Sequence, residues 1–259
     1  MPRAFTQYHS LPHYSVIQVA GNNAQTFLQG QLTCDMRPLS QHGHYSLAAC
    51  CDHRGRMIAN FWVVKWRDDF LIILPESMSS ILMKRLGQYA PLSRVQLKSG
   101  LDHLAILFCH DHKPPETHDH SVAITLPNQN RHLLIGNREQ LPTQGVNEDD
   151  DHWRAQNIID GLVMIYPETS LLFLPQMINL QNLGGISFEK GCYVGQEIIA
   201  RTQHLGTLKR HLQRLTLLQN SSPKPGEILK NYAEKPMGIV VEAVKIQEGK
   251  IDALAVIQD

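Results

Sequence analysis

Hydrophobic positions in the first hundred residues follow two different periods. Residues 15–20 alternate apolar with polar side chains and are rich in β-branched residues, which predicts a strand. Residues 24–32 then carry apolar side chains at helical spacing, and we expect Asn22 or Asn23 to cap this helix. This part of the chain therefore mixes strands with helices.

The same two patterns continue to the end of the chain. Further strands are predicted at residues 45–51, 57–66, 70–74, 104–109, 122–126, 132–135, 212–218, 236–246 and 251–257. Further helices are predicted at residues 78–89, 148–161 and 196–203. After Gly206 only strands and Pro-Gly or Glu-Gly turns follow, so residues 206–259 are predicted to form a small all-β module.

Charge and hydropathy limit the classes of function. The 259 residues carry 24 lysines and arginines against 24 aspartates and glutamates, and this balance argues against direct nucleic-acid binding through overall charge. No apolar run approaches the roughly 18 residues that cross a bilayer, and no apolar leader opens the chain. We therefore expect a cytoplasmic protein with no membrane partner.

The cysteines point to a reducing compartment. There are five of them, an odd number, and none forms a CxxC pair. A disulfide framework and a four-cysteine zinc site are therefore both disfavoured, and reduced thiols are expected.

One of these cysteines lies in a glycine-rich segment late in the chain. Four glycines surround Cys192, which stands shortly before a predicted helix. Backbone N–H groups at the start of that helix, together with Lys190, would favour the thiolate. Gln196 and Glu197 lie in the first helical turn, and Glu197 can pair with Arg201 four residues later. The residues alone leave two interpretations, a reactive or ligating thiol and a buried cysteine in a tight turn. No histidine or aspartate stands at a spacing diagnostic of a hydrolase.

Three motifs carry a specific resemblance. Residues 190–197 read KGCYVGQE and look like the K-G-C-[YF]-x-G-Q-E signature of the YgfZ family, folate-binding relatives of the glycine-cleavage aminomethyltransferase, or T-protein. Residues 27–35 read FLQGQLTCD and residues 51–56 read CDHRGR, and both are similar to motifs of the same family. The three motifs occur in the family's order.

The resemblance implies an α+β fold, with a T-protein-like folate-binding body and a small C-terminal β-barrel. Residues 1–100 and 148–205 would form the interwoven core, residues 101–147 a middle α+β subdomain, and residues 206–259 the barrel.

The implied function is support of iron–sulfur enzymes and their assembly factors, including enzymes that thiomethylate tRNA. Cys192 would be the functional thiol, with Lys190, Gln196, Glu197 and Arg201 around it. Whether it would transiently ligate an iron–sulfur cluster or act by redox chemistry stays open.

Tetrahydrofolate is the implied ligand. Tyr14 and Trp153 match positions that line the family's folate channel, and Gln29, Gln31 and Asn60 would supply polar contacts. The alternatives are that the two aromatics pack in the core and that the glutamines bond backbone groups.

Classical enzymatic turnover is disfavoured, although the sequence leaves it open. The T-protein carries a carboxylate pair after its equivalent turn, whereas Ala59 and Asn60 stand there in this chain. A folate-dependent one-carbon (aminomethyl) transferase is the first rival function. An interaction protein that kept the fold and lost the ligand is the second.

Two polar segments invite other interpretations. Residues 110–120 contain two His-x-His pairs that could ligate a metal ion, but a polar surface loop is favoured, so no metal site is predicted. Lys209, Arg210, His211 and Arg214 form a basic run, for which a solvated strand face is favoured over an anionic partner.

Overall fold

The computed structural model describes residues 7–111, 113–127, 130–142, 147–148, 150–231 and 233–258. Its strands are β1 (Tyr8–Ser10), β2 (Tyr14–Ala20), β3 (Tyr45–Cys51), β4 (Met57–Trp66), β5 (Asp69–Pro75), β6 (Gln96–Lys98), β7 (Leu104–His110), β8 (Ser121–Thr125), β9 (Arg131–Asn137), β10 (Asn147–Glu148), β11 (Arg210–Leu217), β12 (Ile228–Lys230), β13 (Pro236–Gln247) and β14 (Lys250–Gln258). Its helices are α1 (Ala24–Gln31), α2 (Glu76–Gly87), α3 (Asp150–Asp160) and α4 (Gln196–Leu205). Short 3-10 turns occupy Pro91–Ser93, Arg138–Gln140, Pro167–Thr169 and Pro175–Ile178.

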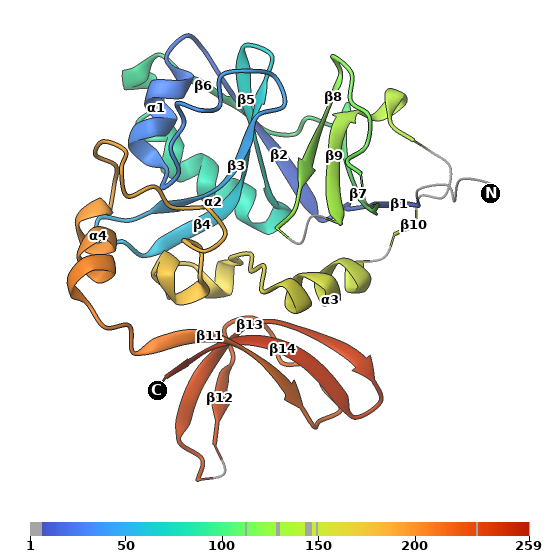
Figure 1. Cartoon of the computed structure of the whole chain (residues 1–259), viewed down its shortest axis with the longest axis vertical. Coiled ribbons are helices and arrows are strands. Elements are labelled where there is room, and N and C mark those ends of the chain that lie inside the picture. The colour runs from blue at the N-terminus through green and yellow to red at the C-terminus, as the bar shows by residue number, and fades with distance from the viewer. Residues whose placement is uncertain are drawn as a thin grey trace.

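Strands in the described ranges form three sheets (Figure 1). The first has the order β3-β4-β5-β2-β6, the second β10-β1-β7-β9-β8, and the C-terminal one β11-β14-β13-β12. Neighbouring strands are antiparallel except for β1 and β10, which pair in parallel. The chain crosses from the second sheet to the first between β1 and β2, so Tyr14 stands at the junction of these two sheets.

The first sheet is built from hairpins that the sequence predicts well. Strand β4 is buried from Met57 to Val64, and β5 is buried from Phe70 to Pro75. Strands whose side chains are buried on both faces of the sheet need other elements packed on both sides. Helices α1 and α2 supply part of that packing (Figure 1). Most of the hydrophobic core lies here and continues into the second sheet and α3.

The C-terminal strands curve around a small cluster of their own, which contains Val240, Ala243, Ile251 and Ala253. Side chains of the opposite face, such as Val241 and Val244, join the main core. Strand β13 lies against α3 (Figure 1). The expected all-β C-terminal module is therefore present as a bent sheet with β11 and β12 at its edges in the described residues.

Most predicted elements are confirmed within a few residues, and the mixed class is α+β as expected. The short strands β1, β6 and β12 were not predicted, because three residues are too few to show a period. Asn23 stands at the N-cap of α1, but its side-chain amide donates to the Ser93 carbonyl and makes no cap hydrogen bond. The predicted start of the third helix at residue 148 is wrong, since α3 begins at Asp150, and Asp149 lies outside the described residues.

The second sheet takes β1 from the N-terminal residues, in addition to strands from residues 101–147. The proposed subdomain boundaries stay predictions. Among the residues that the structure describes, no helix is both long enough and apolar enough to cross a membrane.

Candidate functional site

All three sequence motifs meet at the loop of residues 184–195, which carries Cys192 and is called the Cys192 loop below. The loop lies over the end of α1, where the Val194 N–H donates to the Gly30 carbonyl. Thr33 is fully buried beneath it, and its hydroxyl donates to the Gly185 carbonyl at 2.6 Å and accepts from the Ala49 N–H at 2.8 Å. Thr33 thus joins the first motif to both the loop and strand β3.

Lys190 anchors the loop from below. Its side chain is 4% exposed, and the Nζ atom donates to the carbonyl oxygens of Gln29, Leu32 and Cys34 at 2.6–2.8 Å. These carbonyls belong to the C-terminal end of α1 and the residues after it, where helical hydrogen bonding runs out. Burial lowers the pKa of Lys190 to about 8, while Cys34 and Asp35 oppose that shift.

The expected role of Lys190 changes as a result. An ammonium group has three N–H donors, and the three carbonyls take all of them. Lys190 therefore positions the loop and has no donor left for a Cys192 thiolate, contrary to the sequence-based expectation.

The second motif closes the loop from another side. Gly195 has a φ of +85°, and a Cβ atom there would lie 2.6 Å from the Asp52 carbonyl oxygen and 3.0 Å from the Gly55 Cα. Only glycine permits both this backbone conformation and this approach. The turn of residues 52–55 and the start of α4 therefore touch backbone to backbone.

Cys192 differs from the other cysteines by its access to solvent. It is exposed, whereas Cys34, Cys50, Cys51 and Cys109 are buried, all five being in the described part of the chain. Burial raises the pKa of Cys34 to about 11 and the pKa values of Cys50 and Cys109 to about 12. The alternative of a buried cysteine in a tight turn is wrong for Cys192, and its thiol is the one that a partner can reach.

Other predicted residues of this loop lie nearby without the expected contacts. Gln196 opens α4 and is half-buried, while Glu197 and Arg201 are exposed. No ion pair between Glu197 and Arg201 is present in the described residues, so the predicted pairing is wrong. Two exposed side chains on one helix gain little from pairing in water, which explains why they stay apart.

Gln29 and Gln31 also lie at this end of α1. The Gln29 amide donates to an Asp35 carboxylate oxygen at 3.0 Å, and its carbonyl accepts from the Met36 N–H at 2.7 Å. Gln29 thus shapes the turn after α1. The side-chain carbonyl oxygen of Gln31 is buried and has no hydrogen-bond partner among the described residues.

Tyr14 and Trp153 form a second group of predicted residues. The Trp153 indole N–H donates to the Tyr14 hydroxyl at 3.1 Å, and the rings meet edge to face with centroids 5.9 Å apart. The Arg131 guanidinium lies 5.1 Å from the centre of the Trp153 ring and pairs with Asp160. Tyr14 and Trp153 therefore contact each other, and their expected contact with a folate stays a prediction.

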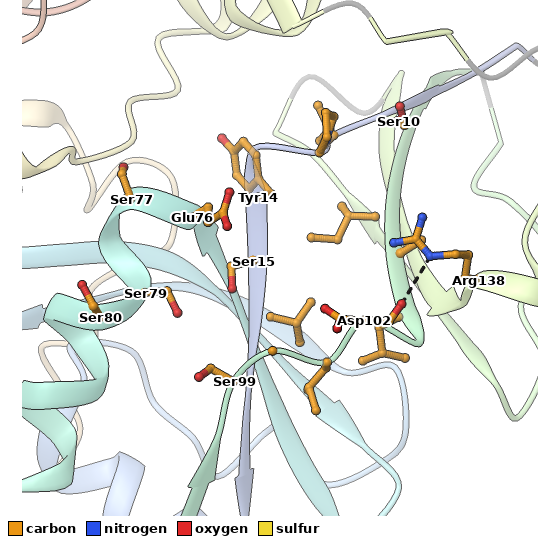
Figure 2. A pocket seen from close by; sticks show the side chains of 18 of the residues that line it. Ser10, Tyr14, Ser15, Glu76, Ser77, Ser79, Ser80, Ser99, Asp102 and Arg138 are labelled. Atoms are coloured by element: carbon orange, nitrogen blue, oxygen red, sulfur yellow. Dashed lines mark hydrogen bonds between the residues drawn. The ribbon is translucent and has the colours of Figure 1, made fainter.

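Tyr14 borders two cavities. The larger has a volume of about 670 Å³ and lies between β2, the start of α2, the segment before β7 and the second sheet (Figure 2). Its polar lining comes from Ser10, Ser15, Glu76, Ser77, Ser79, Ser80, Ser99, Asp102 and Arg138. Leu11, Val16, Met83, Leu101 and Ile106 are among its apolar lining residues. A volume of roughly 300–1,000 Å³ with an apolar wall and a few polar groups is typical of small-molecule sites.

The smaller cavity has a volume of about 190 Å³ and lies where α3 and β13 meet. Trp153, Arg154, Tyr166 and Glu242 line it together with Tyr14. Glu242 is 5% exposed and accepts from Arg154 at 2.7 Å and from the Tyr166 hydroxyl at 2.8 Å. Sequence reasoning missed this network, because its members are up to 88 positions apart and belong to no motif.

Asn60 does not line either cavity. It is fully buried, its amide donates to the Val163 carbonyl at 2.7 Å, and its carbonyl accepts from the Ile165 N–H at 2.7 Å. Asn60 therefore ties β4 to the segment after α3. The expected contact of Asn60 with a cofactor disagrees with this placement.

The structure thus separates the predicted site residues into two groups. Cys192 and its neighbours lie around α1 and α4, whereas Tyr14 and Trp153 lie between the sheets and α3. No group of three or more His, Cys, Asp or Glu side chains converges among the described residues, those of the His-rich loop included. His112 of that loop lies outside the described residues.

Comparison of the chain with models of known protein families finds no match. Curated relatives do match. The tRNA-modifying protein YgfZ of Hamiltonella defensa is 30% identical over 275 residues, which cover 95% of this chain and 82% of that protein. YgfZ of Klebsiella pneumoniae is 31% identical over 272 residues, which cover 93% and 82%. The chain belongs to the YgfZ family.

A solved structure shows the fold of this YgfZ family member. The crystal structure of glycine cleavage system aminomethyltransferase T from Bartonella henselae matches it with a TM-score of 0.74 at 13% identity. The match covers 99% of this chain and 79% of that chain. The predicted T-protein-like fold is therefore confirmed.

Proposed function

We propose that this YgfZ family protein supports iron–sulfur enzymes, including enzymes that thiomethylate tRNA, and that Cys192 is its working thiol. The observation that carries the proposal is the placement of Cys192, an exposed thiol on a loop held by all three motifs. A loop anchored by a buried lysine and a glycine contact holds its cysteine in one conformation. A fixed conformation positions a thiol to meet a partner. The relatives named tRNA-modifying proteins support the link to tRNA.

The proposal includes partners and location. Iron–sulfur enzymes and their assembly factors are the expected partners, and direct nucleic-acid binding is not part of the proposal because the net charge is zero. Five free cysteines support a reducing location, which we take to be the cytoplasm. A transient iron–sulfur cluster at Cys192 and redox chemistry of the thiol are both compatible with its exposure.

The proposal also includes a reduced folate, tetrahydrofolate, in the larger cavity. A pterin needs an aromatic or apolar surface for its ring and polar groups for its edge. Tyr14 and Leu101 supply such a surface, and the Glu76 carboxylate stands next to Tyr14 because Pro75 pairs with Tyr14 in the sheet. Arg138, at the Asp102 side of the cavity, suits the carboxylates of a glutamate tail (Figure 2).

Aminomethyl transfer has less support than folate binding. It needs a group that takes a proton from the attacking nitrogen or gives one to the leaving amine. Asn60 stands where the T-protein carboxylates are expected, and both of its polar atoms are taken by backbone groups. An amide that is bonded in this way offers no acid or base.

Complementation tests the role of the thiol. Cells lacking this gene receive the wild type or Cys192→Ala, and thiomethylated tRNA nucleosides are quantified by mass spectrometry. We expect rescue by the wild type only. Because Cys192 is exposed, the variant should unfold at the same temperature as the wild type, which serves as the folding control. Full rescue by Cys192→Ala would refute the thiol role, and an unchanged nucleoside level in the deletion strain would refute the link to thiomethylation.

Titration calorimetry tests the folate site. Tyr14→Ala should weaken tetrahydrofolate binding by at least about tenfold, because it removes a ring that borders the cavity. Tyr89→Ala is the matched control. Tyr89 is partly exposed, and it lines neither of the two cavities that Tyr14 borders. Equal binding by both variants would place folate elsewhere or exclude it.

A further inference from the structure

Two histidines from distant parts of the chain face each other outside the site described above. His110 ends β7 and His152 lies in the first turn of α3, and their Nε2 atoms are 3.3 Å apart. The two ring centroids are 5.3 Å apart, with an angle of 65° between the ring planes. In the sequence His110 and His112 form a His-x-His pair, whereas the fold brings His110 next to a residue 42 positions away.

This spacing matches two imidazoles that share one metal ion. A tetrahedral ion bound at 2.0–2.1 Å holds two ligating nitrogens about 3.3–3.4 Å apart and their ring centres about 5.2 Å apart. The ring centres of His110 and His152, 5.3 Å apart, are close to that value.

Aromatic neighbours hold one of the two rings in place. His152 stacks on His9 with centroids 5.6 Å apart and on Phe108 with centroids 5.9 Å apart, at angles of 24° and 17°. A ligand ring that is already oriented loses less entropy when an ion binds. His9 lies parallel to His152 and therefore supports that ring rather than ligating beside it.

Solvent reaches the histidine pair, and the neighbouring Arg131 is not an isolated charge. Arg131 is paired with Asp160, which reduces its repulsion of a cation. His110 is exposed, so water can fill the coordination positions that the two histidines leave open.

We propose that His110 and His152 form a two-histidine clamp for a divalent transition-metal ion of the zinc class, with water in the remaining positions. Imidazole nitrogen suits Zn²⁺, Ni²⁺ and Cu²⁺ and does not suit Mg²⁺ or Ca²⁺. The ion would join β7 to α3 one residue before Trp153, so metal binding would restrain the helix that carries that ring.

Zinc titration by calorimetry tests the clamp in a Cys192→Ala background, which removes the exposed thiol as a competing ligand. We expect saturable binding of one Zn²⁺ per chain. His152→Phe keeps an aromatic ring beside His9 and Phe108 but removes the nitrogen, and it should weaken binding by at least about tenfold, as should His110→Ala. His103→Ala, at another exposed histidine, should bind like the background.

Two results would overturn the proposal. One is the same zinc affinity in the background and in His152→Phe. The other is no saturable binding in the background, which would leave the pair as a hydrogen bond between two rings. The unfolding temperature without zinc checks that each variant is folded. Added zinc should raise the unfolding temperature of the background protein and of His103→Ala, but not that of His152→Phe.

Discussion

At the scale of single residues, exposure separates Cys192 from the four other cysteines, which are all in the core. A thiol reagent such as Ellman's reagent reacts with the thiolate and needs access to it. We expect one thiol per native chain to react rapidly and all five after unfolding in urea. Native Cys192→Ala should show no rapid reaction. A second rapidly reacting thiol in native Cys192→Ala would contradict the burial of the other four.

Lys190 gives a second prediction at this scale, on pH dependence. Its pKa in the folded protein is about 8, below the ordinary 10.5. The unfolded chain therefore binds more protons between these two values, so this group makes the free energy of unfolding rise with pH in that window. The slope is at most about 1.4 kcal/mol per pH unit.

Urea unfolding at pH 7.5 and 9.5 measures the effect. The stability difference between the wild type and Lys190→Met should be larger at pH 9.5. Lys190→Met should be the less stable protein at both values, since it leaves three buried carbonyls without their donor. An equal difference at both pH values would show that the Lys190 amine is not desolvated as the structure indicates.

At the scale of elements, the contact between the turn of residues 52–55 and α4 depends on one glycine. Gly195→Ala would place a Cβ atom 2.6 Å from the Asp52 carbonyl oxygen at a positive φ. We expect a loss of at least about 2 kcal/mol in the free energy of unfolding and faster motion of the Cys192 loop in hydrogen exchange. Gly191→Ala is the matched control, because a Cβ atom there meets nothing within 4 Å. Similar stability of the two variants would contradict the close contact.

Elements with a clear period could be predicted from the sequence, and their assembly could not. Strands β3 and β4 have the predicted bounds, because apolar runs on each side of a turn rich in Asp and Gly are a strong local signal. The anchoring of Lys190 could not be predicted, since its three carbonyls are 156–161 positions away. The motifs identified the Cys192 loop, but only the fold shows that Tyr14 and Trp153 lie in a different place.

At the scale of the whole molecule, the C-terminal sheet is joined to the body by an ion pair between a partly exposed arginine and a buried glutamate. Arg154 of α3 bonds Glu242 of β13, and it also donates to the Ala243 carbonyl. Arg154→Met should cost about 1–3 kcal/mol in the free energy of unfolding, because the buried Glu242 carboxylate keeps the Tyr166 hydroxyl but loses its counter-charge. The double variant Arg154→Met/Glu242→Gln should recover part of that loss. Chemical denaturation of the four proteins measures both effects, and strictly additive losses would contradict a direct coupling.

The passage between β1 and β2 has a consequence for the molecule as a whole. Only three residues, from Leu11 to His13, separate a strand of the second sheet from a strand of the first, and the Leu11 N–H is bonded to Ile106 in the second sheet. This short connection ties the two sheets together at Tyr14. The larger cavity is lined by residues of both sheets, so a molecule held there would brace one sheet against the other. Slower amide exchange along β1 and β7 on ligand addition would be its signature.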